Sequence, residues 1–407
     1  MNLPEPILLR SARWLTFGSA VAILLSIAIS QTLLALAVIA LLLSGEKLRL
    51  PPIKLPLALF MAGTVISLAF SAQPAAGLPQ IRKFYVFLEL LVVFSTLRTV
   101  EWIRGLVLSW AAVGGLIAIR GLVQFAASLQ QARALGLNFY DYYAPGERIS
   151  GFMSHWMTFS GQEMFVLLLL LSFLFFAPNA FQRGWIWFLC MGLMSLALLL
   201  GFTRSIWLAT AVSGVYLLWF FRRWLVALVP VAAALLFLLS PASVRERFTS
   251  LVRPKQGIDS NEFRIVTWRT GVHIIREHPL LGVGPEGIKL HFMDYVPADI
   301  PRPLPPGWYG HLHNIYLHYA AERGVPTALV LMWLLLKILF DFARGLRGLP
   351  TGRSNRRFLL HGAIAVVVAT MVAGFFEVNL GDSEVLTMFL VTVACGYLSL
   401  EKELAAA

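Results

Sequence analysis

The chain has 407 residues, of which 58% are hydrophobic and only 13% charged, and its mean hydropathy is +0.75. These values exclude an ordinary soluble globular protein, and several apolar runs approach the roughly 20 residues that cross a bilayer as a helix. We therefore predict an all-α polytopic membrane protein in contact with membrane lipids. In a soluble domain the net charge of +12 would suggest a nucleic-acid partner. In a membrane protein, basic residues are explained first by the orientation of the helices, so no nucleic-acid partner is predicted.

In chain order, the apolar runs predict about twelve transmembrane helices. The predicted ranges are 13–29, 31–44, 55–72, 83–98, 104–127, 158–177, 185–202, 204–221, 224–240, 313–342, 357–377 and 384–400. This gives nine helices in residues 1–240, a large loop subdomain in residues 241–312 and three helices in residues 313–407. The first run is interpreted as a retained helix, because another run follows at once and no small-x-small cleavage site closes it.

The loops between these runs predict an orientation. If both termini are cytoplasmic, every cytoplasmic connection is basic, as the positive-inside rule requires. The clearest case is a cluster of five arginines, at Arg344, Arg347, Arg353, Arg356 and Arg357. The long segment 241–312 then lies outside. We predict in it a helix beginning near Asn261, with Phe263, Val266 and Ile274 at helical spacing, and an irregular proline-dense stretch over residues 296–310.

Some basic residues on the predicted outer side are not explained by orientation. They are Arg82 and Lys83, Arg133, Arg148, Arg204, and several arginines between residues 240 and 312, among them Arg264. Taken singly, Arg204 could extend to lipid headgroups, and Arg264 could pair with Glu262 or Glu277. Taken together, they predict a site for a multiply charged anion at the membrane boundary. A lipid-linked pyrophosphate is the natural candidate, because the arginine fork matches phosphate oxygens.

Two other motifs are given structural interpretations. Gly282, Gly284 and Gly287 have the spacing of a dinucleotide-binding loop, but no parallel-sheet context surrounds them, so a tight turn is predicted. The spacing His-x-His-x4-His, starting at His311, matches no zinc motif, and Cys190 and Cys395 lie inside apolar runs, so no metal or other cofactor is predicted. His313, at the outer water boundary, has an imidazole suited to accept a proton from a hydroxyl near pH 7.

Three segments resemble the motifs of the O-antigen ligase and polymerase superfamily. They are TRSIWLA (203–209), FRIVTW leading into HPLLGVGPEG (263–287) and HNIYLHYAAERGVPTALV (313–330). The resemblance implies a GT-C-type glycosyltransferase with one large periplasmic loop containing short helices. Such an enzyme takes a glycan from undecaprenyl pyrophosphate and, as an O-antigen ligase, transfers it to a hydroxyl of lipid A-core. It acts without a metal on the periplasmic side of the bacterial inner membrane.

The resemblance also implies residue roles. Arg204 and Arg264 would contact pyrophosphate, and His313 would act on the acceptor hydroxyl. Glu322 and Gly324 would be structural, the glutamate pairing within its helix and the glycine allowing close packing. Departures from the family pattern are Thr203, where a serine is usual, and the additional histidines His311 and His318. His318 is predicted to be a packing residue, and the choice of base between His313 and His311 stays open.

Other functions remain as alternatives at this point. A repeat-unit polymerase and a protein O-oligosaccharyltransferase of the same superfamily share the donor chemistry and differ in the acceptor. A lipid-linked glycan transporter belongs to another class and would show charges near mid-membrane, where only Arg120 and Glu163 are obvious. Direct displacement predicts inversion at the anomeric carbon. A covalent route would need a carboxylate nucleophile, for which the outer-side candidates are Asp294, Asp299, Glu377 and Asp382.

Overall fold

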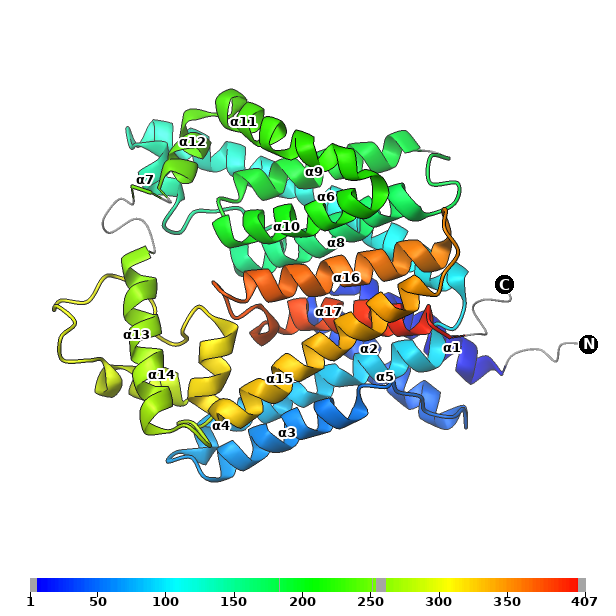
Figure 1. Cartoon of the computed structure of the whole chain (residues 1–407), viewed down its shortest axis with the longest axis horizontal. Coiled ribbons are helices and arrows are strands. Elements are labelled where there is room, and N and C mark those ends of the chain that lie inside the picture. Colours follow the sequence, from blue (N-terminus) through cyan, green and yellow to red (C-terminus); the bar gives the residue numbers. More distant parts are fainter. Residues whose placement is uncertain (1–5, 183, 251, 254–260, 402–407) are drawn as a thin grey trace, which may run out of the picture.

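The computed structural model describes residues 6–182, 184–250, 252–253 and 261–401. Every regular element in these ranges is a helix, and most of the helices run side by side in one bundle (Figure 1). The predicted all-α class is therefore confirmed.

The twelve apolar ranges predicted from the sequence each overlap a helix of the bundle. These helices are α1 (Ile7–Ala22), α2 (Ile27–Leu43), α3 (Lys54–Ala69), α5 (Leu88–Thr96), α6 (Val100–Ala134), α8 (Trp156–Phe176), α9 (Gly184–Leu200), α10 (Arg204–Arg222), α11 (Val229–Leu239), α15 (Ile315–Arg347), α16 (Asn355–Ala373) and α17 (Ser383–Leu398). The remaining elements are short or lie in the connections: α4 (Pro74–Arg82), α7 (Phe139–Tyr143), α12 (Ala242–Thr249), α13 (Asn261–Glu277), α14 (Gly287–His291) and the 3-10 helices η1 (Lys83–Phe87), η2 (Arg223–Leu228), η3 (Phe292–Tyr295) and η4 (Asn379–Gly381).

Five stretches of the described chain are long and apolar enough to cross a membrane. They are Val100–Ala134, Trp156–Phe176, Arg204–Leu239, Ile315–Arg347 and Asn355–Ala373, and four shorter apolar helices accompany them. These helices identify a multi-pass membrane protein. The count of twelve spans stays a prediction.

Helix α8 lies at the centre of the bundle. It packs against α6, α9, α10, α16 and α17, and nearly all of its residues are buried. Helix α11 is the opposite case, because none of its residues is buried and its leucines face outward. An all-apolar helix with this exposure is typical of a surface that lipid covers.

The two ends of the bundle differ in what they carry. The five-arginine cluster spans the end of α15, the connection that follows and the start of α16. It lies at one end together with the start of α1 and the end of α17 (Figure 1). Helices α13 and α14 lie beyond the other end. This arrangement agrees with the predicted placement of both termini on the arginine side. Which membrane face each end occupies stays a prediction.

The outer segment forms a small core of its own. Helix α13 begins at Asn261 and buries Phe263, Val266 and Ile274, and the last two belong to a cluster that includes Phe292 and Leu312. The predicted helix is therefore confirmed, and residues 296–310 are irregular as predicted. Residue 251 and residues 254–260 of the predicted loop subdomain lie outside the described residues.

The glycine-rich stretch forms the predicted turn. Gly282 and Gly284 have φ of +67° and +92°, a region that residues with a Cβ rarely adopt. The backbone N–H groups of Val283 and Gly284 donate to the carbonyls of Ala321 (2.9 Å) and Glu322 (2.8 Å). The turn therefore returns the chain onto the first part of α15.

The first part of α15 ends at a kink. Gly324 has a φ of +82°, and a Cβ there would lie 1.9 Å from the carbonyl oxygen of Leu280. Only glycine allows this approach, which confirms the predicted close packing. Glu322 pairs with His318 one turn earlier, at 3.4 Å between Nε2 and Oε2, as predicted for a pair within the helix.

Candidate active site

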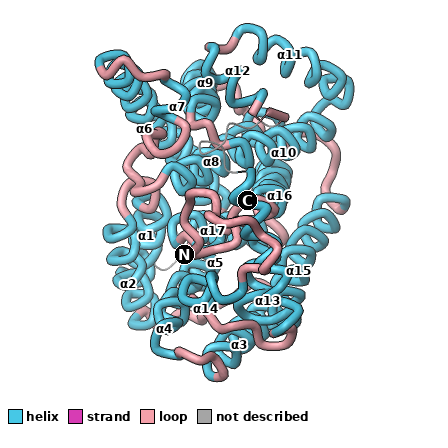
Figure 2. The backbone as a smooth tube through the Cα atoms, turned by 90° about the vertical axis from the view of Figure 1, so that its left-hand side faces the viewer, coloured by secondary structure: helices cyan, strands magenta, loops and turns pink. Residues whose placement is uncertain are grey.

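A cavity of about 860 Å³ opens at the end of the bundle opposite the arginine cluster. Figure 2 looks at this end, with α7 and α12 on one side and α4, α13 and α14 on the other. The cavity is lined by the first residues of α8, α10 and α13, by the segment that precedes α15 and by the connection between α16 and α17. Helix starts and the connections between helices therefore supply most of its polar wall.

The start of α15 is fastened to the connection between α16 and α17. The Asn314 side-chain oxygen caps the helix by accepting the backbone N–H of Tyr316 at 3.0 Å, and its amide donates to the Phe375 carbonyl at 3.1 Å. An asparagine cap of this kind satisfies backbone donors that the helix itself leaves open. As a result, His313 lies beside Glu377, which follows Phe375 by two residues.

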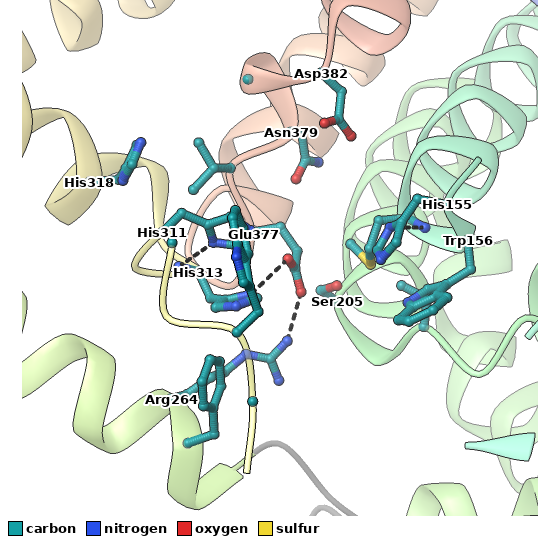
Figure 3. A pocket seen from close by; sticks show the side chains of 18 of the residues that line it. His155, Trp156, Ser205, Arg264, His311, His313, His318, Glu377, Asn379 and Asp382 are labelled. Atoms are coloured by element: carbon teal, nitrogen blue, oxygen red, sulfur yellow. Dashed lines mark hydrogen bonds and ion pairs between the residues drawn. The ribbon is translucent and has the colours of Figure 1, made fainter. Parts of the chain in front are cut away.

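Glu377 joins two of the predicted site residues. Its Oε1 lies 2.7 Å from Nη2 of Arg264, and its Oε2 lies 3.3 Å from Nδ1 of His313 (Figure 3). The Arg264 guanidinium thus reaches the connection between α16 and α17 and lines the cavity. One oxygen of this buried carboxylate thus pairs with a guanidinium, and the other contacts an imidazole.

The surroundings of Glu377 keep its side chain ionised. Burial by itself would raise the pKa of Glu377, but the hydrogen bond from His313 and the positive charge of Arg264 outweigh burial and lower it to about 2. An ionised carboxylate only accepts hydrogen bonds, so Nδ1 of His313 carries the proton in this pair. In the neutral ring Nε2 is then free to accept a proton.

The backbone at His313 is strained. Its φ is +49°, in the left-handed region that a residue with a Cβ enters at a cost on the order of 1 kcal/mol. The ring lies 5.0 Å from the Phe263 ring and 3.9 Å from the His311 ring, measured between centroids. The loop conformation and these neighbours hold the imidazole over the cavity.

The structure gives His311 a role different from that of His313. Nδ1 of His311 accepts the backbone N–H of His313 at 3.2 Å, so the proton of neutral His311 is on Nε2, where it can only donate. Burial and the nearby charge of His313 lower the pKa of His311 to about 3, so His311 is neutral near pH 7. These contacts favour His313 over His311 as a proton acceptor.

Arg204 lines the same cavity as the first residue of α10. Its guanidinium donates to Ser250 Oγ at 3.0 Å and to Asn261 Oδ1 at 2.7 Å. These contacts connect α10 to the end of α12 and the start of α13. One cavity is therefore lined by Arg204, Arg264 and His313, although Arg204 and His313 are 109 positions apart in the sequence.

The structure separates the adjacent pair Arg82 and Lys83. Lys83 lines the cavity and donates from Nζ to the Gly381 carbonyl at 3.0 Å. Arg82 ends α4 with an exposed side chain and is not among the cavity-lining residues. The residues before this pair, which no predicted range covered, form helix α4.

Two cavity arginines were not assigned to the site by the sequence. Arg148 donates to the Ala144 carbonyl, at 2.7 Å from Nε, and its guanidinium lies 5.0 Å from the ring centroid of Trp156. Arg247, only 3% exposed, donates to the Phe202 carbonyl at 3.0 Å. The sequence signal for both was their position on the predicted outer side, where orientation does not explain a cation.

His155 was also missed by the sequence reasoning. Its Nδ1 accepts the backbone N–H of Met157 at 3.2 Å and so caps α8, and Figure 3 shows it beside Trp156 on the wall facing His313. Burial lowers its pKa, with a smaller contribution from Arg148 in the same direction, so the ring is neutral near pH 7. Because Nδ1 accepts, Nε2 carries the proton, and this wall presents a donor.

The four carboxylates considered as nucleophiles are not equivalent. Asp294 and Asp299 are paired on the surface, with His291 and Arg269, and do not line the cavity. Asp382 lines the cavity and accepts a hydrogen bond from Thr158.

Among the described residues, histidine, cysteine, aspartate and glutamate nowhere form a group of three or more that could hold a metal ion.

Comparison with known proteins agrees with this site. An arginine-lined cavity at one end of a multi-pass helical bundle, with an imidazole held by a carboxylate, fits a membrane enzyme acting on an anionic substrate. Residues 189–332 match the family described as O-antigen ligase. This match supports the O-antigen ligase superfamily for that part of the chain, and so confirms the resemblance seen in the sequence. No curated protein matches the chain.

Proposed function

We propose that this protein is an O-antigen ligase-type glycosyltransferase of the GT-C class. It would transfer a glycan from undecaprenyl pyrophosphate to a hydroxyl of lipid A-core, on the periplasmic side of the bacterial inner membrane and without a metal. The observation that carries the proposal is the bridge of Glu377 between Arg264 and His313, in a cavity that Arg204 also lines. Both arginines and the histidine fall within the region matched to the family.

His313 is the proposed general base. With Nδ1–H donated to Glu377, Nε2 removes the proton of the acceptor hydroxyl while its oxygen attacks the anomeric carbon of the donor sugar. Help of this kind contributes about 100- to 10,000-fold to a rate. Glu377 positions the ring, fixes its tautomer and stabilises the imidazolium that forms, as a carboxylate partner of histidine generally does.

The arginines are proposed to act on the leaving group. When the bond between the anomeric carbon and the phosphate oxygen breaks, negative charge grows on the pyrophosphate, and donors fixed in advance stabilise that charge. One such donor is typically worth about 2.7–4 kcal/mol. Arg204 and Arg264 are the proposed primary contacts, and Lys83, Arg148 and Arg247 raise the positive potential of the same cavity.

We favour direct displacement over a covalent intermediate on Glu377. Both of its oxygens are engaged, and its low pKa makes it a weak nucleophile. Attack by the acceptor hydroxyl on the side opposite the pyrophosphate inverts the anomeric carbon.

The test is reconstitution of the purified protein in lipid vesicles with a glycan on undecaprenyl pyrophosphate. Separate reactions contain lipid A-core, a second lipid-linked repeat unit or a protein acceptor, each with and without excess chelator. We expect transfer to lipid A-core, with an inverted linkage, at an unchanged rate in chelator. Transfer only to the repeat unit or the protein would replace the ligase assignment by another activity of the superfamily. Loss of transfer in chelator would contradict metal independence.

A further inference from the structure

Trp308 is an exposed indole at the mouth of the cavity. It belongs to the irregular stretch 296–310, it lines the cavity, and 58% of its surface is exposed. Scattered exposed leucines are ordinary, but a large aromatic ring beside convergent polar groups is typical of a binding site. None of the proposed steps of proton or pyrophosphate transfer uses this ring.

Contacts on one side hold the ring in place. Its edge meets the ring of His311, with 4.8 Å between centroids and an angle of 83° between planes. Gly310 lies beneath it, since a Cβ on this glycine would be 2.0 Å from Trp308 Cζ2. Gly307, on the other side of Trp308, packs so closely on Phe263 that a Cβ would lie 2.4 Å from its ring. The two glycines therefore let the loop fold this indole against the histidines.

The held ring lies next to the proposed base. His311 touches Trp308 on one side and His313 on the other, with 3.9 Å between the two imidazole centroids. A molecule resting on the open part of the indole therefore lies beside His313. The exposed carboxylate of Glu262, at the start of α13, lines the same cavity and can accept hydroxyl hydrogen bonds.

We propose that Trp308 is the stacking platform for the acceptor sugar, the pyranose ring whose hydroxyl His313 deprotonates. A pyranose has one face made of C–H groups, which packs on an indole, and hydroxyls around its rim, which need polar partners. An apolar ring with a carboxylate and imidazoles in one cavity matches both needs. The inference rests on the proposed function and adds the residue that recognises the acceptor.

Membrane anchoring is the competing role of this tryptophan, because indoles also gather at membrane interfaces. An anchor needs a large apolar side chain that reaches lipid, whereas a sugar platform needs a flat ring directed into the cavity. Leucine at this position would partly serve as a membrane anchor but not as a sugar platform. Phenylalanine would serve as either.

The experiment compares Trp308→Phe, Trp308→Leu and Trp308→Ala in the reconstituted transfer reaction. The KM for lipid A-core and the KM for the undecaprenyl pyrophosphate donor are measured separately. We expect the Leu and Ala variants to raise the acceptor KM about tenfold, the donor KM to stay unchanged, and Phe to remain close to wild type. The matched control is Trp185→Leu, at an exposed tryptophan of α9 that is outside the cavity lining, with no expected change.

A binding measurement separates the two proposals. Calorimetry with the delipidated acceptor oligosaccharide reports the sugar site without any transfer, and we expect binding to wild type and a loss of about tenfold in Trp308→Leu. An equal affinity of Trp308→Leu and wild type, or an effect on the donor KM alone, would overturn the sugar platform. Absence of transfer by wild type, with oligosaccharide binding still sensitive to Trp308, would instead reject the ligase function and retain the site.

Discussion

Basic residues gather at both ends of the helix bundle, but the two ends use them differently. At the arginine end, Arg356 donates to the Ser399 carbonyl at 2.7 Å and Arg98 pairs with Glu46 at 2.9 Å, each at the end of a helix. At the cavity end, Arg204 and Arg264 come from different helices and line one space. If the arginine end is cytoplasmic, as predicted, the positive-inside rule accounts for the first set but not for the second. An anionic ligand would account for the second set.

The substitution His313→Ala is expected to have the largest effect at the cavity end. Removal of the proposed base should lower the transfer rate by about 100- to 10,000-fold, while binding of undecaprenyl pyrophosphate changes little. Single-turnover transfer and direct donor binding measure the two effects. The control is His278→Ala, an exposed histidine that hydrogen-bonds Tyr295 outside the cavity. Full transfer by the His313 variant would show that another group is the base.

Arg264→Gln is expected to have the next largest effect. Loss of one preorganised cation should cost about 2.7–4 kcal/mol of transition-state stabilisation, which is about 100- to 1,000-fold in transfer. The matched control at the other end is Arg98→Gln, which breaks a half-buried pair outside the cavity and should leave transfer unchanged. An equal loss of transfer rate in both variants would mean that the substitutions act on folding. The two ends of the bundle would then not differ in their use of arginine.

Glu377→Gln should act through His313 and cost less. Glutamine keeps the shape of the side chain but carries no charge, so the imidazolium formed in the reaction loses its partner, and we expect transfer to fall about 10- to 100-fold. The effect should appear in kcat, with donor KM nearly unchanged, and Glu377→Asp should recover part of it. A trapped glycosyl-enzyme on Glu377, or retention at the anomeric carbon, would make this residue a nucleophile instead.

The sequence predicted the helices well because each apolar run carries its own signal. Arg204, Arg264 and His313 were also predicted, since each opens or adjoins a helix at a recognisable motif. The Glu377 bridge was not predicted, although Glu377 stood among the candidate carboxylates. Its partners lie 64 and 113 positions away, and hydropathy contains no information on such distances.

The sequence did not foresee the course of the chain at Arg82 or at Arg148. The stretch before Arg82 lay between two predicted spans, yet it forms α4, which Pro74 begins at a position where proline is tolerated. Arg82 ends this helix outside the cavity lining, whereas Lys83, at the start of η1, lines the cavity. Arg148 enters the cavity through an irregular connection, whose course depends on packing against α8 and not on any local pattern.

The smallest expected effect concerns His311 and the acid sensitivity of the cavity end. Its pKa falls from 6.5 to about 3 in the folded chain, so between these values the unfolded state binds a proton that the folded state does not, and stability decreases as pH falls below 6.5. At pH 5 the folded state loses about 2 kcal/mol of stability through His311. Glu377 does not yet contribute at this pH, because its stabilising ionisation is lost only below about pH 4.5.

The measurement is thermal unfolding of the detergent-solubilised protein at pH 7.5 and pH 5. The decrease in unfolding temperature on acidification should be smaller by a few degrees for His311→Asn than for wild type, whereas His278→Asn should behave as wild type. An identical acid shift in all three proteins would mean that His311 is as hydrated as an exposed histidine, and the cavity end would then lack the burial that distinguishes it from the arginine end.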